Sequence, residues 1–148
     1  MKLRNKMTIE ELKEYLNKDD VVCALSTGDQ VITSNLKGVR PWLKWLRECP
    51  ELLVGAMVAD KVVGKAAAML MVVSKVKTVY TPLMSEQALV YLETQSLEVH
   101  YDGTVPYITN NDQSGLCPME TTVLHVTDAH EGHRLLMAQV AELMKSKS

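Results

Sequence analysis

Apolar residues in this chain recur with two different spacings, and the change from one to the other predicts an α/β protein. Stripes with a period near 3.6 residues indicate amphipathic helices, whereas short runs rich in Val, Ile and Leu indicate strands. The predicted elements are, in order, a helix opened by the capping box Thr8–Glu11, strands at Val21–Leu25 and Val31–Thr33, a helix at Pro41–Glu48, a buried strand at Leu52–Ala59, an Ala-rich helix that begins between Lys61 and Lys65 and runs to about Val73, a strand at Val76–Thr81, a helix at Ser85–Gln95, a strand at Leu97–Tyr101 and a final helix after Asp128.

This order predicts one domain built in layers. The first two strands are joined by the polar turn Ser26–Asp29 and form a hairpin. Strands that then alternate with helices lie parallel to one another and are linked by right-handed crossovers. We therefore expect a three-layer α-β-α domain with a mixed sheet of about five strands. It covers residues 1–148 as a single domain with an additional C-terminal helix.

The junction after the strand Leu52–Ala59 is the strongest candidate for a ligand site. Asp60 and Lys61 end the strand, and Gly64 and Lys65 open the Ala-rich helix. Ligands of open α/β sheets bind where the carboxyl end of a strand meets the positive amino end of a helix. Gly64 allows close approach of a ligand or a neighbouring helix, and Lys65 opposes the helix dipole unless an anion lies beside it. Asp60 orients a lysine or a ribose hydroxyl, or it caps the helix.

Two further motifs flank this junction. They are Gly38-Val-Arg-Pro41 upstream and Asn110-Asn-Asp-Gln-Ser-Gly-Leu-Cys-Pro-Met-Glu120 downstream. With the junction, they resemble a small microbial family that is classed as a domain of unknown function and has a cytidine-deaminase-like fold. The resemblance extends from about Val21 to about Val126. It implies a cytidine-deaminase-like domain, in which a hairpin is followed by alternating helices and strands.

The resemblance does not extend to the zinc site of the deaminases. Zinc deaminases place a His or Cys and a Glu at one helix start and Pro-Cys-x-x-Cys at the next. Here the corresponding helix starts carry Arg40 and the pair Lys61 and Lys65. We therefore expect no metal and no cofactor. A cationic site formed by these side chains predicts an anionic small-molecule ligand, such as a nucleotide or another phosphorylated compound.

The polar segment before Cys117 has the composition of a loop that folds over a pocket. Its candidate ligand contacts are Asn110, Asp112 and Ser114. Cys117 lies at the start of a predicted helix, where the dipole lowers the pKa of a thiol, so it is the candidate catalytic nucleophile. Glu120 follows in the first turn and is a further candidate ligand contact. The alternative for Cys117 is a small buried thiol, since no histidine lies beside it in sequence to act as a base.

Composition limits the classes of partner and the cellular compartment that we expect for this protein. A net charge of −2 disfavours a dedicated nucleic-acid partner. The three cysteines are widely spaced with no Cys-x-x-Cys pair, which favours a reducing cytoplasm over a disulfide scaffold. No apolar run is long enough to cross a bilayer, so we expect a cytoplasmic protein with no membrane partner. Trp42 and Trp45 serve as core residues or as contacts of a homodimer.

Three functions are compatible with these features. A binding protein would hold a nucleotide or other phosphorylated ligand for sensing or regulation. An enzyme would use Cys117 for thiol chemistry on such a ligand. A structural subunit would retain a vestigial site. The cationic junction favours the binding protein.

Overall fold

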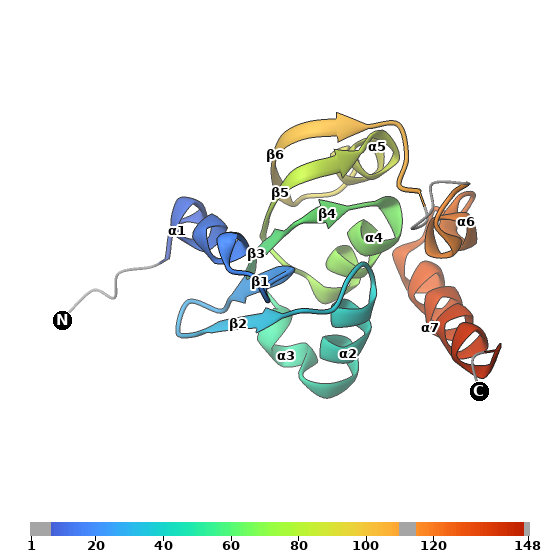
Figure 1. Ribbon diagram of the computed structural model, residues 1–148, viewed down its shortest axis with the longest axis horizontal. Helices are drawn as coiled ribbons and strands as arrows, with labels where there is room; N and C mark the ends of the chain where they lie inside the picture. Colours follow the sequence, from blue (N-terminus) through green and yellow to red (C-terminus); the bar gives the residue numbers. More distant parts are fainter. Residues whose placement is uncertain (1–6, 110–114, 147–148) are drawn as a thin grey trace.

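The computed structural model describes residues 7–109 and 115–146, which form a layered α/β domain (Figure 1). The helices and strands are α1 (Ile9–Lys13) with the short 3-10 helix η1 (Glu14–Asn17), β1 (Cys23–Ser26), β2 (Val31–Ser34), α2 (Arg40–Glu48), α3 (Pro50–Leu53), β3 (Met57–Asp60), β4 (Val62–Val63), α4 (Lys65–Ser74), β5 (Thr78–Ser85), α5 (Glu86–Glu93), β6 (Glu98–Val105), α6 (Pro118–Val123) and α7 (Ala129–Ser146).

The sheet is mixed, as the sequence predicts. Strand β1 pairs antiparallel with β2, which confirms the predicted hairpin. On its other side β1 pairs antiparallel with β3. Strands β3 and β4 pair in parallel with successive parts of β5, and they therefore act as one strand interrupted at Lys61. Strand β6 pairs in parallel with the other side of β5. The carboxyl ends of β4, β5 and β6 consequently lie along one end of the sheet.

Helices cover both faces of the sheet. Helix α1 packs through Leu12 on one face, in a small apolar cluster that contains Ala24 and Ala59. Strand residues that alternate with these, among them Cys23, point into the main core on the other face. Helices α2, α4 and α5 cover that second face, and α7 packs outside α4 (Figure 1).

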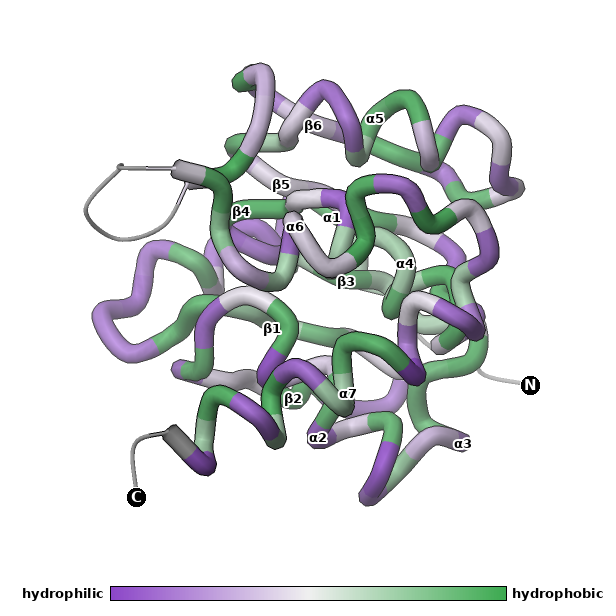
Figure 2. Tube along the Cα trace, turned by 90° about the vertical axis from the view of Figure 1, so that its right-hand side faces the viewer, coloured by the Kyte–Doolittle hydropathy of each residue, from purple (hydrophilic) through white to green (hydrophobic). Residues whose placement is uncertain are grey.

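Helix α4 is the centre of the main core. Its buried residues are Ala66, Ala67, Ala68, Met69, Leu70, Met71 and Ser74. The three small alanines allow neighbouring elements to approach its backbone closely, and the longer side chains fill the space around them. Hydrophilic and hydrophobic residues alternate along helix α7 (Figure 2). This helix covers α4, because its Ala129 and Leu136 are buried in the main core and its Val140 packs against that core. This confirms the prediction of a central, buried helix after Asp60.

The predicted capping box at Thr8 is present, and Asp128 caps the final helix. Thr8 accepts a hydrogen bond from the Glu11 backbone, and the Glu11 side chain binds the Thr8 backbone in return. At the start of α7, the Asp128 carboxylate accepts a hydrogen bond of 2.9 Å from the backbone of Glu131. Among the described residues, no helix combines the length and the apolar character needed to cross a membrane.

The prediction of one continuous buried strand at Leu52–Ala59 is wrong. Pro50 occupies the first turn of the short helix α3, a position that suits proline because the amide there needs no helical partner. Gly55, with φ of 76°, turns the chain in a left-handed conformation after that helix. The strand therefore begins only at Met57. Val62 and Val63 then extend the strand as β4, where the sequence predicted a direct turn into the helix.

Candidate ligand-binding pocket

The carboxylate of Glu120 binds the amino end of helix α4. Its two oxygens accept hydrogen bonds from the backbone N–H of Lys65 at 2.9 Å and of Ala66 at 3.1 Å. Glu120 is 5% exposed, so these bonds form out of water. The first amides of a helix have no partner within the helix, and a carboxylate there also meets the positive end of the dipole. The anion that the sequence predicts beside Lys65 is thus supplied by the chain itself.

Gly64 provides the space for this contact. A Cβ atom at Gly64 would lie 2.5 Å from Oε2 of Glu120 and 2.8 Å from Cγ1 of Ile108. Such distances are far below van der Waals contact, so a larger residue would force Glu120 or Ile108 to move. The predicted close approach at Gly64 is therefore confirmed, and the group that approaches the Gly64 backbone is the side chain of Glu120.

The Lys65 side chain is half-buried beside this carboxylate. Its ammonium donates a hydrogen bond of 3.2 Å to the carbonyl oxygen of Leu124, just after α6. Burial lowers the pKa of Lys65, and the nearby charge of Glu120 acts in the opposite direction. Burial also raises the pKa of Glu120, while the two backbone bonds and Lys65 work against that rise. The half-buried lysine and the buried carboxylate therefore stabilise each other's charged forms.

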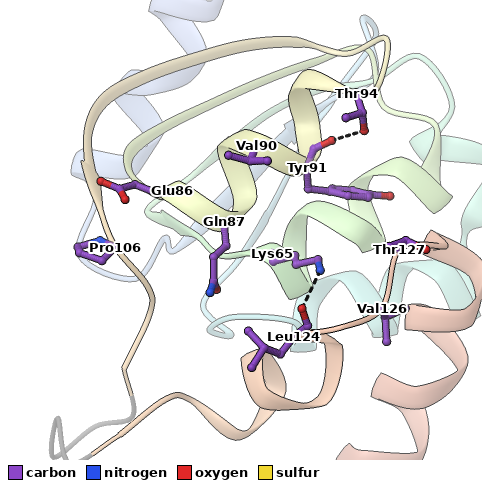
Figure 3. Close-up of a pocket in the computed structure, with 10 residues that line it drawn as sticks. All are labelled: Lys65, Glu86, Gln87, Val90, Tyr91, Thr94, Pro106, Leu124, Val126 and Thr127. Carbon is purple, nitrogen blue, oxygen red and sulfur yellow. Dashed lines mark hydrogen bonds between the residues drawn. The ribbon is translucent and has the colours of Figure 1, made fainter.

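A pocket of about 640 Å³ opens next to this lysine (Figure 3). We call it the Lys65 pocket, and its lining residues are Lys65, Glu86, Gln87, Val90, Tyr91, Thr94, Pro106, Leu124, Val126 and Thr127. Glu86 directly follows β5 and Pro106 directly follows β6, so the pocket lies at the carboxyl ends of parallel strands. Open α/β sheets bind their ligands at this end.

Lys65 is the positively charged member of this lining, and Glu86 is the negatively charged one. The remaining wall is largely apolar, with the ring of Tyr91 along one side and Val126 and Leu124 below it (Figure 3). Burial and the charge of Asp128 raise the pKa of Tyr91, so its hydroxyl remains a neutral hydrogen-bond donor. An apolar wall with a few polar groups is typical of a small-molecule site.

The structure separates the three basic residues that the sequence grouped. Lys61 lines a different pocket of about 600 Å³, which includes Lys13 of α1 and Tyr80 and so lies on the opposite face of the sheet. Arg40 is exposed at the first position of α2 and lines neither pocket. The predicted convergence of Arg40, Lys61 and Lys65 on one site is therefore wrong, since Lys61 continues the strand in register and lies, like Ala59 two residues before it, on the face that α1 covers.

Asp60 is enclosed in the core. It is 1% exposed, and its carboxylate accepts a hydrogen bond of 3.3 Å from the indole N–H of Trp42. Burial raises the pKa of Asp60 to about 7, against bonds from Trp42, Cys23 and the following backbone amides. It does not cap α4, because the residue before that helix is Gly64. Asp60 instead joins strands β1 and β3 to α2.

Cys117 lies just before α6 and is half-buried against the main core. Its backbone N–H bonds to the carbonyl of Ile108 at 3.1 Å. Cys117 is not among the residues that line the Lys65 pocket. Glu120, one turn further along the chain, is the residue of this segment that contacts Lys65. Asn110, Asp112 and Ser114 fall outside the described residues. Gly64, Lys65 and Glu120 are thus the predicted site residues that the structure brings into contact.

Residues of α5 complete the pocket, and the sequence reasoning missed them. Glu86 and Gln87 lie in the first turn after β5, where carboxyl-end ligand contacts are expected. The predicted strand stopped at Thr81, four residues before the end of β5 at Ser85. Extension of that strand to the Ser85 cap, which binds the backbone of Ala88 at 3.0 Å, would have identified them.

Among the described residues, no group of three or more His, Cys, Asp or Glu side chains is arranged to hold a metal ion. The residues present in the described ranges therefore do not fit the zinc centre of a deaminase. The expectation that the protein binds no zinc stays a prediction, to be tested by metal analysis of the purified protein.

The fold and the pocket define an α/β protein with a mixed sheet and a pocket at the carboxyl ends of its parallel strands. Residues 11–140 match the TM1506 family, described as a domain of unknown function (DUF1893), and the chain belongs to this family. The crystal structure of a DUF1893 family protein (TM1506) from Thermotoga maritima is similar, with a TM-score of 0.81 and 24% sequence identity over 94% of this chain and 96% of that one. The comparison with curated proteins found no match.

Proposed function

We propose that this protein is a zinc-free, cytidine-deaminase-like domain that binds an anionic small molecule in the Lys65 pocket. The observation that carries the proposal is the state of the Lys65 ammonium. An ammonium has three N–H donors, and one of them bonds to Leu124. Among the described residues, the carbonyl of Leu124 is the one hydrogen-bond acceptor of this ammonium, so two of its donors remain available at the pocket wall.

The charges of the pocket limit the ligand to a single anionic group. Lys65 is balanced within the lining by Glu86, which would repel a polyphosphate. The volume of about 640 Å³ lies in the range of sites for drug-sized molecules. A ring would pack against Tyr91, while Glu86 and Gln87 would accept or donate hydrogen bonds at its polar edge. A nucleoside monophosphate has this combination of groups.

The deaminase-like part of the proposal rests on topology and on the helix starts. A hairpin, β1 and β2, precedes strands that alternate with helices, as the family resemblance implies. At the starts of α2 and α4, where zinc deaminases keep metal ligands, this chain has Arg40 and Lys65. We therefore propose ligand binding in place of zinc-dependent deamination.

Substitution of Lys65 tests the proposal. The wild-type protein and Lys65→Met would be titrated calorimetrically with the four common nucleoside monophosphates. Loss of a charge-assisted hydrogen bond should weaken binding of the preferred ligand by about tenfold to a hundredfold. Lys61→Met is the matched control, because Lys61 is also a half-buried lysine but lines the pocket on the other face. The Lys61→Met variant should bind the preferred nucleotide with the affinity of the wild type.

A steric variant locates the ligand independently of charge. Val90 is 65% exposed and lines the pocket, so Val90→Trp should leave the melting temperature unchanged while it fills the cleft. Equal affinity of the Lys65→Met, Val90→Trp and wild-type proteins would reject this pocket. Native mass spectrometry of the purified protein would show any ligand that remains bound and would extend the test beyond nucleotides.

The thiol enzyme and the structural subunit make different predictions. Because Cys117 does not line the Lys65 pocket, the binding protein should keep full affinity in a Cys117→Ser variant. A thiol enzyme would keep its ligand and lose turnover. A structural subunit would bind none of the probes in either form.

A further inference from the structure

Strand β6 forms an open edge of the sheet. It is eight residues long, from Glu98 to Val105, and among the described residues it pairs with β5 alone (Figure 1). The N–H of Glu98 bonds to the carbonyl of Lys77 at 2.9 Å, on the side of β5. Because successive residues of a strand direct their backbone groups to opposite sides, Val99, Tyr101 and Gly103 direct theirs outward. The described strands leave this row of donors and acceptors without a ladder partner.

The sequence of β6 lacks the lysines and prolines that commonly block an open edge. Natural edge strands are commonly short, or carry Lys, Pro or a covering element that blocks pairing with another chain. The opposite edge of this sheet, β2, has four residues. Strand β6 is twice as long and contains no Lys, Arg or Pro between Glu98 and Val105. A long open strand of this kind is a template for a further strand.

We propose that a second copy of this chain pairs with β6, antiparallel to the first and related to it by a two-fold axis at Tyr101. In this register Tyr101 lies opposite Tyr101 of the second copy, and each exchanges both backbone hydrogen bonds with the other. Val99 lies opposite Gly103 of the second copy in the next hydrogen-bonded pair. The outward backbone groups are then satisfied, and the two sheets become one continuous sheet.

Charge decides this register against its neighbours. With the axis at Tyr101, His100 lies opposite Asp102 of the second copy, in a close non-hydrogen-bonded pair. An axis at His100 would oppose the two histidines and place Glu98 opposite Asp102, and an axis at Asp102 would oppose two aspartates. Axes at Val99 or Gly103 shift the pairing away from the middle of the strand and leave part of it unpaired.

The monomer already orients the groups that this pairing uses. The hydroxyl of Tyr80 donates to the Asp102 carboxylate, and His100 lies 2.6 Å from Glu98 on the same strand. Glu98, His100 and Asp102 of β6 are exposed, so a second copy can reach them without rearrangement of the core. Tyr101 is 43% exposed, a large side chain at the centre of the proposed interface that pairing would cover.

Complementary charge variants test the interface and its axis together. Because Tyr101 faces itself, Tyr101→Lys and Tyr101→Glu should each place like charges opposite one another and weaken self-association by about tenfold or more. An equal mixture of the two variants should associate again as a mixed dimer. Thr33→Lys is the control, since Thr33 is an exposed residue of the other edge strand, β2.

Sedimentation velocity across a micromolar concentration series measures the outcome. The wild type and Thr33→Lys should reach twice the 16.5 kDa mass of the single chain. Circular dichroism would confirm that both Tyr101 variants are folded. A wild type that stays at 16.5 kDa throughout, or Tyr101 variants that dimerise like the wild type, would overturn the proposal. Failure of the mixture to associate, with both variants monomeric, would reject the axis at Tyr101.

Discussion

Glu120 and Lys65 hold helix α6 against the start of α4 by bonds that run in both directions. The Glu120 carboxylate accepts from the backbone N–H of Lys65, and the Lys65 ammonium donates to the carbonyl of Leu124 just after α6. The two residues are 55 positions apart in sequence, so the contact closes a long loop of chain. It also fixes the position of the lysine that borders the proposed ligand pocket.

Removal of the Glu120 carboxylate should destabilise the protein strongly. Glu120→Ala leaves the amides of Lys65 and Ala66 buried without an acceptor, and we expect a loss of about 2–4 kcal/mol in the free energy of unfolding. Glu120→Gln retains one good acceptor and should lose about half as much. Urea denaturation followed by circular dichroism measures both, and Glu93→Ala, at an exposed position on α5, is a suitable control.

A double variant distinguishes a direct contact from two separate effects. Gly64→Ala alone should cost about 1–3 kcal/mol, because its methyl group would lie 2.5 Å from the Glu120 carboxylate. In Gly64→Ala combined with Glu120→Ala the methyl group gains room, so the combined loss should be smaller than the sum. Additive losses would show that Gly64 and Glu120 do not share this space.

Sequence reasoning found the members of this site but not their relationship. Gly64 and Lys65 stood out because each is unfavourable at an ordinary helix start, and Glu120 because it follows Cys-Pro at another. A local pattern predicts that a helix start needs an anion. It does not tell whether a ligand or a distant carboxylate provides it, since that depends on how α6 packs against α4.

Stability should depend on pH through Asp60. Burial raises the pKa of its carboxyl group from 3.8 to about 7 in the folded protein. Between these values the folded protein holds a proton that the unfolded chain has released. The stabilising contribution of Asp60 is therefore complete below about pH 4 and is lost as the pH rises through 7, by up to roughly 4 kcal/mol. Urea denaturation at a series of pH values measures this decline.

The Asp60→Asn variant isolates this effect from other titrating groups. Burial also raises the pKa of Glu120, which contributes with the same sign in both proteins. The stability of Asp60→Asn relative to the wild type should therefore increase from pH 4 to pH 8. Asp20→Asn, at an exposed position, should follow the wild-type curve. Parallel curves for Asp60→Asn and the wild type would contradict an elevated pKa at Asp60.

Cys23 should resist alkylation until the protein unfolds. Burial raises the pKa of its thiol well above the usual value, and the charge of Asp60 adds to the rise. In native protein, iodoacetamide should modify Cys23 at least about 10³-fold more slowly than in urea, since access requires opening of the core. Peptide mass spectrometry measures the rates, with the half-buried Cys117 as the internal comparison. Equal native rates at Cys23 and Cys117 would contradict the packing of β1.

Element types were more predictable than element boundaries. The order of helices and strands follows from hydrophobic spacing and from caps such as those at Thr8 and Ser85, which act locally. The segment Leu52–Ala59 was mispredicted because an apolar run of that length suits a buried strand as well as a short buried helix and a turn. Strand β5 passes through Pro82 because that residue lacks a pairing partner in β6, a fact of tertiary packing.

The central position of α4 makes its alanines the most sensitive positions for a charge. Ala68 is fully buried, and α4 is packed against the sheet on one side and α7 on the other. Ala68→Glu would place a longer, charged side chain where neither space nor a partner exists, so we expect a loss of more than about 4 kcal/mol and no cooperative melting transition. Ala68→Ser adds one oxygen and should cost only about 1–2 kcal/mol, which keeps the comparison measurable. Val62→Glu, at a residue 38% exposed on β4, should melt close to the wild-type temperature. A soluble Ala68→Glu protein with a wild-type transition would mean that α4 does not lie between the sheet and α7.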